Sequence, residues 1–284
     1  MSDLAIQQFS KDERVIKDED FEYFQSLVFK LAGITLSDKK RDLLLTRLTT
    51  HLKKINLGSY SDYRNYLQGL PKDHEEWQSF INLMTTNKTD FFREIRHFDY
   101  IEEVLIPKWI QAKKTEVKVW SAACSTGEEP YTLAMFLEAK LPVGMSYKIM
   151  ASDIDTNVIE KAKNGVYSMG KESEIPHEYR KNSIDYGRGE IADWFRIKHS
   201  LKNKITFFNL NLVDQSLEGE KFDLILCRNV MIYFSRAVVE QVANNLARAC
   251  GDDGILFIGH SESLQGTKTP WKVSTASVYS KNRR

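Results

Sequence analysis

Cysteine is scarce in this chain of 284 residues, and its three cysteines fit neither a metal site nor a disulfide framework. Cys124, Cys227 and Cys250 have no metal-ligand spacing, and their odd number argues against complete pairing. Each has apolar or small neighbours, the setting in which a free thiol is most often part of the core. We therefore expect buried, reduced cysteines and a reducing cytoplasmic environment.

The sequence also lacks a long apolar run, a secretory leader and a net charge of either sign. No stretch approaches the roughly 20 apolar residues of a membrane span, and the N-terminus lacks the basic-then-apolar plan of a signal peptide. Forty Lys and Arg residues face 39 Asp and Glu residues, which gives a formal net charge of +1. We therefore expect neither nucleic acid binding nor membrane insertion, and any electrostatic recognition must be local.

The first part of the chain has helical periodicity from Asp20 to about Met84. The apolar residues that open this pattern at spacings of three and four are Phe21, Phe24, Leu27, Val28 and Leu31. Gly33 is expected to end this helix, and Ser37 with Asp38 to cap the next one. Before this pattern, residues 1–20 are polar and are expected to form a frayed leader. The first part of the chain therefore predicts a small helical domain.

From about residue 116, short apolar runs alternate with helical segments. The runs are VKVWSAA, YKIMASD, ITFFNLN, FDLILCR and GILFIGH. The helical segments between several of them are residues 130–140, 156–164 and 236–249. This alternation predicts an α/β domain with a mostly parallel sheet covered on both faces. The alternation lapses between Gly165 and Lys204, which predicts a small inserted subdomain.

The turn after the first strand of this sheet carries two acids where phosphate-binding turns carry glycines or lysine. The turn, SAACSTGEEPY, matches neither GxGxxG nor the GK[ST] of a P-loop. Ligands of open parallel sheets bind beyond the carboxyl ends of the strands, so this turn presents Ala123 to Glu129 to the ligand. A carboxylate there would repel a pyrophosphate and attract a cation. The alternative is that Glu128 and Glu129 are solvated first-turn acids favoured by the helix dipole.

The second strand ends at Asp153, where an acid commonly accepts both ribose hydroxyls of a nucleoside. The alternative role of helix N-cap suits Asp155 better, because it directly precedes TNVIEKAK. A nucleoside with ribose hydroxyls, positive charge and no phosphate describes S-adenosylmethionine, whose sulfonium and α-amino groups are cationic. The sequence therefore favours this cofactor.

Polar residues follow two further strands. Asn209 and Asn211 end ITFFNLN, and their amides can both donate to and accept from an adenine edge. Arg228 and Asn229 directly follow the buried run FDLILC, with Tyr233 shortly after. The alternative for Arg228 is a side chain that extends from the core to solvent.

The segment TTNKTDFFREIRHF joins the two parts of the chain. Residues 86–89 are expected to cap a helix, and Phe91, Phe92 and Ile95 to anchor that helix in the core. One interpretation is a well-capped connecting helix. The other places Asn87, Thr89 and Arg93 over the cofactor.

Five motifs in this order and spacing resemble the chemotaxis receptor methyltransferases, the CheR family. They are NKTDFFRE, WSAACSTGEEPYTLAM, ASDIDTNVIEKAKNGVY, CRNVMIYF and GHSESL, and the likeness covers nearly the whole chain. It implies methyl transfer from S-adenosylmethionine to glutamate side chains of chemoreceptors, with S-adenosylhomocysteine as the product and no metal. It also implies a Rossmann-like methyltransferase domain with a small inserted antiparallel β subdomain, preceded by an all-α domain.

We accordingly expect a helical domain over residues 1–84, with residues 1–20 flexible, and a methyltransferase domain over residues 85–284. The inserted subdomain is expected at about residues 165–204. The resemblance implies a cofactor site lined by Asn87, Thr89, Arg93, Glu129, Asp153, Asn211, Leu212, Arg228 and Asn229, to which the strand-end argument adds Ala123.

Arg93 and Tyr233 would lie closest to the transferred methyl group by the same resemblance. A glutamate side chain has a reference pKa of about 4.3, so it is already deprotonated at neutral pH and requires no general base. The two side chains would therefore orient the incoming carboxylate. His260, in GHSESL, is expected to be structural.

Two features predict how the receptor is held. Lys40, Arg47, His51 and Lys54 share one helical stripe, which is either a solvated face or a docking surface for the cytoplasmic helical region of a receptor. In some members of the family the β subdomain binds the receptor's C-terminal peptide as an added strand. The segment Gly187–Gly189 resembles the glycine-bearing loop of those members, but the GEIADW that follows departs from their pattern.

Two other functions compete with receptor methylation. One is methylation of a different substrate, such as a small molecule or RNA, although RNA would favour a broad basic surface with exposed aromatic residues. The other is a signalling module that binds S-adenosylmethionine or S-adenosylhomocysteine without transferring a methyl group.

Overall fold

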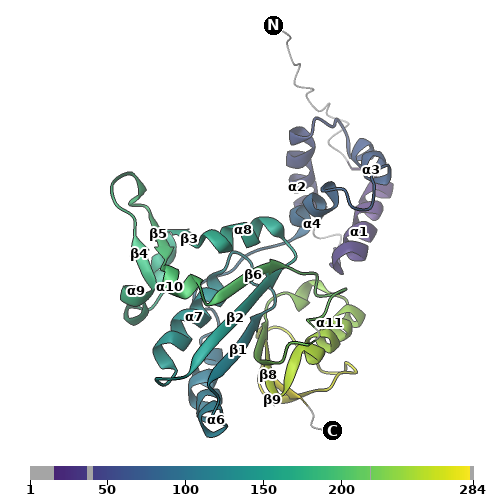
Figure 1. Ribbon diagram of the computed structural model, residues 1–284. Helices are drawn as coiled ribbons and strands as arrows, with labels where there is room; N and C mark the ends of the chain where they lie inside the picture. The colour runs from purple at the N-terminus through teal and green to yellow at the C-terminus, as the bar shows by residue number, and fades with distance from the viewer. Residues whose placement is uncertain (1–15, 37–40, 218, 282–284) are drawn as a thin grey trace. The chain divides into compact units, whose positions relative to one another are not determined.

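The computed structural model describes residues 16–36, 41–217 and 219–281, and the chain forms two compact units (Figure 1). The first unit ends at Thr86 and the second begins at Asn87. No helix in the described ranges has the length and hydropathy of a membrane span.

The described part of the first unit is built from helices. They are α1 (Asp18–Ala32), α2 (Arg41–Lys54), α3 (Tyr60–Gln68) and α4 (Glu76–Met84). Their apolar stripes meet in a core that includes Phe24, Leu48, Tyr63 and Phe80, all fully buried. The predicted helical domain is confirmed, because residues at spacings of three and four do share one inward face.

The first helix begins at Asp18, two residues before the expected Asp20, and it ends at Gly33 as expected. Asp20 belongs to the first turn of α1 and is buried, with an ion pair to Arg64 at 2.9 Å and a hydrogen bond from Ser61 at 2.7 Å. The polar leader is therefore shorter than predicted, and residues 1–15 lie outside the described residues. At the other end, Gly33 has a φ of 69°, which allows its amide to close the helix on Phe29. The cap predicted at Ser37 and Asp38 lies outside the described residues.

A buried polar group links three helices of this unit. The Oε1 atom of Glu76 lies 2.6 Å from His51 Nε2 and also accepts a hydrogen bond of 2.6 Å from the Tyr63 hydroxyl. Burial by itself would raise the pKa of Glu76, but the hydrogen bonds from His51 and Tyr63 outweigh it and lower the pKa. The ionised carboxylate therefore bonds to the half-buried His51 on α2 and the buried Tyr63 on α3.

Replacing Glu76 should destabilise the helical unit. The substitution Glu76→Ala leaves the Tyr63 hydroxyl and the His51 ring buried without a partner, which should cost about 2–3 kcal/mol of unfolding free energy. Urea unfolding followed by circular dichroism measures this loss. Glu75→Ala is the matched control, because Glu75 is exposed and its side chain makes no capping hydrogen bond. Equal stability of the two variants would contradict the role of this group.

The second unit contains a seven-stranded sheet. Its strands are β1 (Glu116–Ser121), β2 (Ser146–Asp153), β6 (Ile205–Asn209), β7 (Phe222–Cys227), β8 (Cys250–Ile258), β9 (Trp271–Thr275) and β10 (Val278–Lys281). The order across the sheet is β6-β2-β1-β7-β8-β10-β9, and the first five of these strands are parallel. The predicted apolar runs form those five strands. The antiparallel hairpin of β9 and β10 was not predicted, because both strands are short and β9 is mostly exposed.

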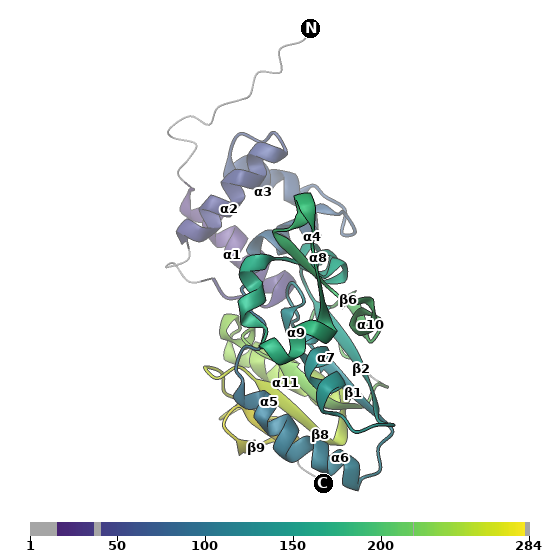
Figure 2. The same cartoon turned by 90° about the vertical axis from the view of Figure 1, so that its left-hand side faces the viewer.

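Helices cover both faces of this sheet. They are α5 (Arg96–Tyr100), which continues through a π-helical turn (Ile101–Leu105) into α6 (Ile106–Gln111), and α7 (Glu128–Lys140), α8 (Thr156–Asn164) and α11 (Arg236–Ala249). Figures 1 and 2 show α7 running alongside β1 and β2. One core holds Val119 and Phe257 against α6 and α7, and the other holds Trp120 and Leu256 against α11. The alternation of inward positions along each strand explains the two cores.

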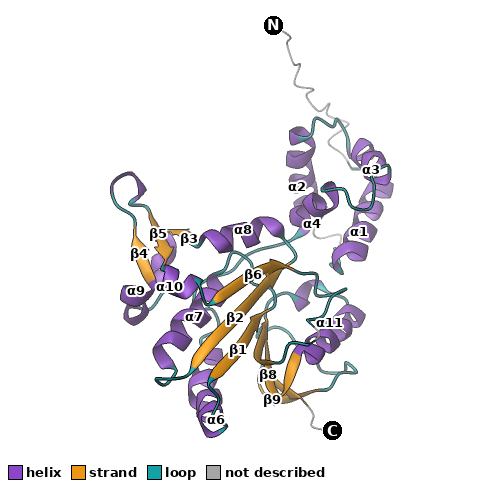
Figure 3. Cartoon of the chain, in the orientation of Figure 1, coloured by secondary structure: helices purple, strands orange, loops and turns teal. Residues whose placement is uncertain are grey.

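A small antiparallel sheet is inserted after α8. It consists of β3 (Val166–Ser168), β4 (Ile184–Tyr186) and β5 (Trp194–Ile197), in the order β3-β5-β4 (Figure 3). The short helices α9 (His177–Ser183) and α10 (His199–Lys202) join it to α7, against which both pack. The predicted inserted antiparallel subdomain is confirmed. The three cysteines are free and buried, as expected.

Candidate active site

The strand order reverses next to β1. From β1 the chain moves to β2 on one side, and it later returns to β7 on the other side. Ligands of open parallel sheets bind at the carboxyl ends of the strands where the order reverses in this way. The side chains that follow β1, β2, β7 and β8 therefore define the candidate site.

The turn after β1 is shaped by contacts within the protein. Gly127 has a φ of 98°, and a Cβ atom on it would lie 2.9 Å from both Ala162 Cβ and the Tyr167 hydroxyl oxygen. Tyr167 also donates a hydrogen bond of 2.7 Å to the carbonyl of Thr126. The glycine is therefore required by close packing against α8 and the inserted sheet.

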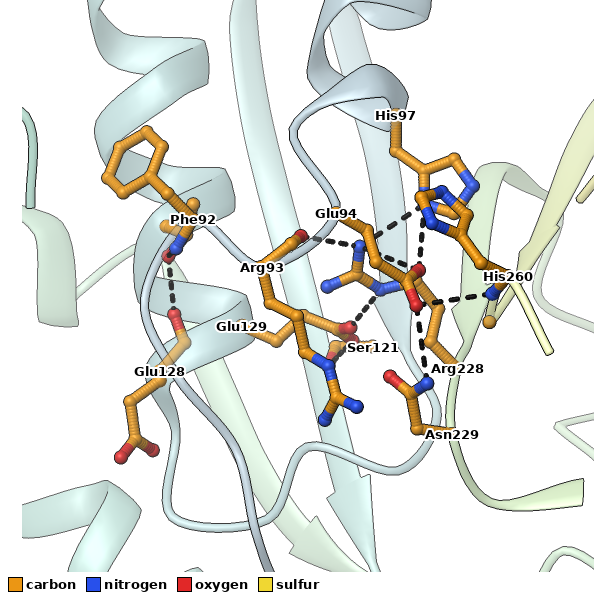
Figure 4. Close-up of polar contacts among 12 residues, drawn as sticks. Phe92, Arg93, Glu94, His97, Ser121, Glu128, Glu129, Arg228, Asn229 and His260 are labelled. Carbon is orange, nitrogen blue, oxygen red and sulfur yellow. Dashed lines mark hydrogen bonds and ion pairs between the residues drawn. The ribbon is translucent and has the colours of Figure 1, made fainter. Parts of the chain in front are cut away.

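Both acids that follow Gly127 are buried, so the interpretation of either as a solvated first-turn residue is wrong. The carboxylate of Glu128 lies 2.9 Å from Lys171 Nζ and accepts a hydrogen bond of 2.6 Å from Thr126. The carboxylate of Glu129 accepts hydrogen bonds from Ser121 at 2.6 Å and from Arg228 Nε at 2.7 Å. Figure 4 shows the two carboxylates pointing to different sides of the turn, with that of Glu129 at the ends of the central strands.

Arg228 is the centre of a buried charge group. Its Nε atom binds Glu129, and its Nη1 atom lies 3.6 Å from Glu94 Oε2, 2.9 Å from the Arg93 carbonyl and 3.1 Å from His97 Nδ1 (Figure 4). Its side chain is 3% exposed, so the predicted alternative of extension to solvent is wrong. Burial and the neighbouring guanidinium lower the pKa of His97 to about 3, so the imidazole is neutral. Two carboxylates therefore share one cation.

The segment before α5 is not the expected capped helix. Residues 85–90 form neither a helix nor a strand, and α5 begins only at Arg96. Phe92 and Glu94 have φ values of 51° and 59°, a left-handed conformation that interrupts helix formation. Phe91 is buried as expected, but Ile95 is 51% exposed. Sequence periodicity could not reveal this, because tertiary hydrogen bonds hold the backbone in that conformation.

Asp153 lies at the carboxyl end of β2, as predicted. Its Oδ2 accepts a hydrogen bond of 2.8 Å from the Ser125 amide and its Oδ1 one of 3.0 Å from the Asp155 amide. Burial is the main reason that the pKa of Asp153 is raised to about 6. Asp155 caps α8 through the amides of Asn157 and Val158, which confirms its predicted role as the N-cap.

Asn87 and Thr89 lie beside these groups. The amide of Asn87 donates a hydrogen bond of 2.6 Å to Asp155 Oδ2, and its carbonyl accepts one of 2.9 Å from Ser125. The carbonyl of Thr89 accepts a hydrogen bond of 2.8 Å from Lys171 of the inserted subdomain. Ala123 is half-buried in the turn after β1. Contacts from two strand ends and the insert therefore fix the backbone of this segment.

The polar residues at the end of β6 contact the end of β2 and the turn that follows β6. Asn209 donates to the carbonyls of Asp153 and Ile154, so it ties β6 to the end of β2. The side chain of Asn211 accepts from the Val213 amide at 3.1 Å and donates to Asp214 at 2.8 Å. Leu212 is buried. Asn211 and Leu212 therefore belong to a compact turn next to Asp153.

The loop after β7 is held by an acid that was not predicted. Glu262 is buried and accepts hydrogen bonds from the amides of Asn229 at 2.9 Å, Ile232 at 3.2 Å and Gly259 at 2.6 Å. Asn229 has a φ of 58°, and the turn that contains it leads to the half-buried Tyr233. Glu262 is the acid of the motif GHSESL, but the sequence does not indicate that it contacts the loop after β7.

The predicted docking stripe has a mixed environment. Arg47 donates hydrogen bonds to the carbonyls of Leu83 and Thr85 within the helical unit, and His51 is bonded to Glu76. Lys54 is exposed, whereas Lys40 lies outside the described residues. The stripe is therefore not a uniform exposed face, and docking of a receptor to it stays a prediction.

One cluster has the residue types of a metal site. Among the described residues, potential ligand atoms of Glu94, His97 and His260 lie within 4.8 Å of one another. The guanidinium of Arg228 already lies against Glu94 and His97, and its positive charge opposes a second cation at the same place. The ring of the exposed His260 lies against that of His97, with centroids 5.2 Å apart, and its backbone amide donates a hydrogen bond of 3.1 Å to Glu94.

Comparison with known proteins gives matches along nearly the whole chain. Residues 19–85 match the CheR methyltransferase all-alpha domain, and residues 87–280 match the CheR methyltransferase SAM binding domain, where SAM is S-adenosylmethionine. The "Chemotaxis protein methyltransferase" of Salmonella typhimurium is 35% identical over 266 residues, which are 93% of this chain and 90% of that protein. The protein of the same name from Borreliella burgdorferi is 36% identical over 282 residues, 96% of this chain and 98% of that protein.

A solved structure, a TehB-like SAM-dependent methyltransferase from Corynebacterium glutamicum, is 15% identical over 66% of this chain and 96% of that one. Its TM-score of 0.36 is too low to add to the assignment. The two family domains follow each other in the order of the two units, and the relatives extend over more than nine-tenths of the sequence. The chain therefore belongs to the CheR methyltransferase family.

Proposed function

We propose that this protein transfers the methyl group of S-adenosylmethionine to glutamate side chains of chemoreceptors, forming glutamyl methyl esters. The observation that carries the proposal is the excess of buried negative charge at the strand ends. Glu94 and Glu129 share the single guanidinium of Arg228. No Lys or Arg of the described ranges forms an ion pair with the buried Asp153. Such a site favours a cationic nucleoside over a phosphorylated one.

The residues present fit the cofactor. The carboxylate of Asp153 has lone pairs beyond those used by two backbone amides, so it can accept both ribose hydroxyls. Glu129 is the acid of the turn that faces the strand ends, and it would attract the cationic amino-acid part. Asn211 and Leu212 would border the adenine. Ala123, Asn87 and Thr89 would line the rest of the cofactor site.

The proposed mechanism requires positioning more than acid–base chemistry. When bound, S-adenosylmethionine supplies a methyl group already activated by its sulfonium. A substrate glutamate is ionised at neutral pH, and the neutral His97 is buried away from it, so no residue needs to remove a proton. Arg93 and Tyr233 would hold the incoming carboxylate in line. Alignment of this kind contributes roughly 7–11 kcal/mol to a displacement.

The names of the relatives support a role in chemotaxis. Chemoreceptors are therefore the proposed substrates of this chain. Lys54 would contact the receptor's cytoplasmic helical region, together with the other residues of the predicted stripe. Binding of a receptor C-terminal peptide to the edge of the inserted sheet stays a prediction. The reduced cysteines fit the cytoplasm as the proposed place of reaction.

Radiolabelled methyl transfer tests the proposal. Incubation with methyl-labelled S-adenosylmethionine and receptor-bearing membranes should place label on the receptor, and mild base should release it as methanol because methyl esters hydrolyse. Arg93→Ala and Tyr233→Phe should lower kcat. Label that resists base would indicate a different acceptor atom. Cofactor binding without any transfer would instead support the signalling module.

Cofactor affinity should depend on the charge of Asp153. The pKa of about 6 means that its carboxyl gains a proton as the pH falls below about 6, and the protonated group accepts fewer hydrogen bonds. Affinity for S-adenosylhomocysteine, measured by calorimetry, should therefore be constant near neutral pH and decrease below about pH 6. Asp153→Asn should weaken binding roughly 10- to 100-fold at neutral pH and abolish this pH dependence.

Asp185→Asn is the control, because Asp185 lies on β4 of the inserted sheet with its carboxylate partly exposed. It should bind like the parent protein. An unchanged affinity of Asp153→Asn would contradict ribose binding by Asp153.

Charge reversal at Lys54 should weaken receptor recognition. Lys54→Glu should lower kcat/KM for the receptor several-fold at low salt, because a rim charge mainly affects association, and high salt should remove the difference. Affinity for S-adenosylhomocysteine should not change. Lys53→Glu, on the same helix but off the predicted stripe, is the matched control. Equal effects of the two variants would contradict docking by the stripe.

A further inference from the structure

We propose that Glu94 is a positioning residue, which holds Arg93 at the site by tying its backbone to the ends of β7 and β8. The inference rests on the proposed function, because it assigns a role in orienting the glutamate that Arg93 would hold. Glu94 belongs to the motif NKTDFFRE, and the mechanism above gives it no task.

The backbone on both sides of Arg93 is in an unfavourable conformation. Phe92 and Glu94 have φ values of 51° and 59°, and neither is a glycine. A non-glycine residue in the left-handed region is strained and persists only where surrounding contacts enforce that conformation. Two such residues within three positions require strong local restraints.

The restraint on the N-terminal side comes from α7. The amide of Phe92 donates a hydrogen bond of 3.1 Å to the Thr132 hydroxyl, and Thr132 in turn donates one of 2.7 Å to the carbonyl of Glu128. The preceding amide, that of Phe91, donates a hydrogen bond of 2.9 Å to Glu174 of the inserted subdomain. These contacts fix the chain up to Arg93.

Glu94 supplies the restraint on the C-terminal side. Its Oε1 atom accepts hydrogen bonds from the Asn229 side chain at 3.2 Å and from the His260 amide at 3.1 Å. Its Oε2 atom lies 3.6 Å from Arg228 Nη1, and that same nitrogen donates to the Arg93 carbonyl at 2.9 Å. One side chain thus joins the residue after Arg93 to both strand ends, while Arg228 holds Arg93 itself (Figure 4).

The charge of Glu94 is necessary for this arrangement. Oε2 is buried with no hydrogen-bond partner, and it lies 3.5 Å from Nδ1 of the neutral His97 and 3.6 Å from Arg228 Nη1. Its ionic interaction is therefore the one with Arg228. Burial would raise the pKa of Glu94, but the Arg228 charge and the hydrogen bonds outweigh it and lower the pKa. A glutamine of the same shape would keep the Oε1 contacts and place an amide NH₂ against the guanidinium, a repulsive contact.

The position of the Glu94 contacts determines which kinetic constant should change. The cluster of Glu94, His97 and Arg228 lies behind the Arg93 backbone, and the cofactor residues Asp153 and Asn87 are held by other contacts. Loss of the restraint should therefore displace the Arg93 side chain without altering ribose binding. A displacement of about 1 Å at such a residue lowers a rate up to roughly 100-fold.

A double-mutant cycle tests the inference. Arg93→Ala, Glu94→Gln and the double variant are compared by kcat and KM for receptor methylation and by affinity for S-adenosylhomocysteine. Glu94→Gln should lower kcat by a factor between about 10 and about 100, with a much smaller change in cofactor affinity. Added to Arg93→Ala, it should change kcat by no more than about twofold, because the residue through which it acts is already absent.

Glu138→Gln is the control, because Glu138 lies on α7 and contacts Tyr147, away from the strand ends. It should leave kcat unchanged in both backgrounds. If Glu94→Gln does not fold, Glu94→Asp keeps the charge and shortens its reach, and the same cycle applies. Equal losses from the Glu94 variant with and without Arg93, or a loss of cofactor affinity as large as the loss of kcat, would overturn the positioning role.

The same measurements separate this inference from the function on which it rests. Absence of methyl transfer by the unmodified protein overturns the proposed function, and the positioning role with it. Normal transfer by the unmodified protein with additive losses in the cycle overturns the positioning role alone.

Discussion

The ion pairs of Arg228 with Glu129 and Glu94 are the interaction on which the site depends. The three side chains come from β7, the start of α7 and the segment before α5, and each would be costly to bury alone. The arginine forms an ion pair with both acids and also donates a hydrogen bond to the Arg93 carbonyl. Segments separated by more than 130 residues along the chain are thereby held at one edge of the sheet.

This arrangement answers why the turn after β1 carries two adjacent acids. Glu128 and Glu129 are successive residues on a helix, so their side chains project about 100° apart and face different neighbours. Glu128 pairs with Lys171 of the inserted subdomain, and Glu129 pairs with Arg228. One acid therefore stabilises the insert, and the other contributes negative charge to the strand ends.

Periodicity and motif order predicted the fold well, because the strands that end at Asp153 and Cys227 are short segments rich in apolar residues, and the helix stop at Gly33 has a local cause. These patterns did not predict the conformation where contacts between residues far apart in the sequence determine it. Phe92 and Glu94 adopt positive φ values through bonds to α7 and the strand ends, and no local pattern signals this. His51 and Arg47 likewise read as surface cations, whereas partners on α4 and just beyond it bind both. The predicted cofactor residues are near one another, but their pairing was not foreseeable from spacing.

The packing around Gly127 links two parts of the protein that could otherwise vary independently. Since Ala162 and Tyr167 leave no room for a side chain at position 127, residues of the α8–β3 junction and the turn after β1 must be compatible as a set. A chimaera that exchanges the inserted sheet between relatives would therefore have to transfer the residue at position 167 together with its matching turn. The packing of the inserted sheet thus extends as far as the turn after β1.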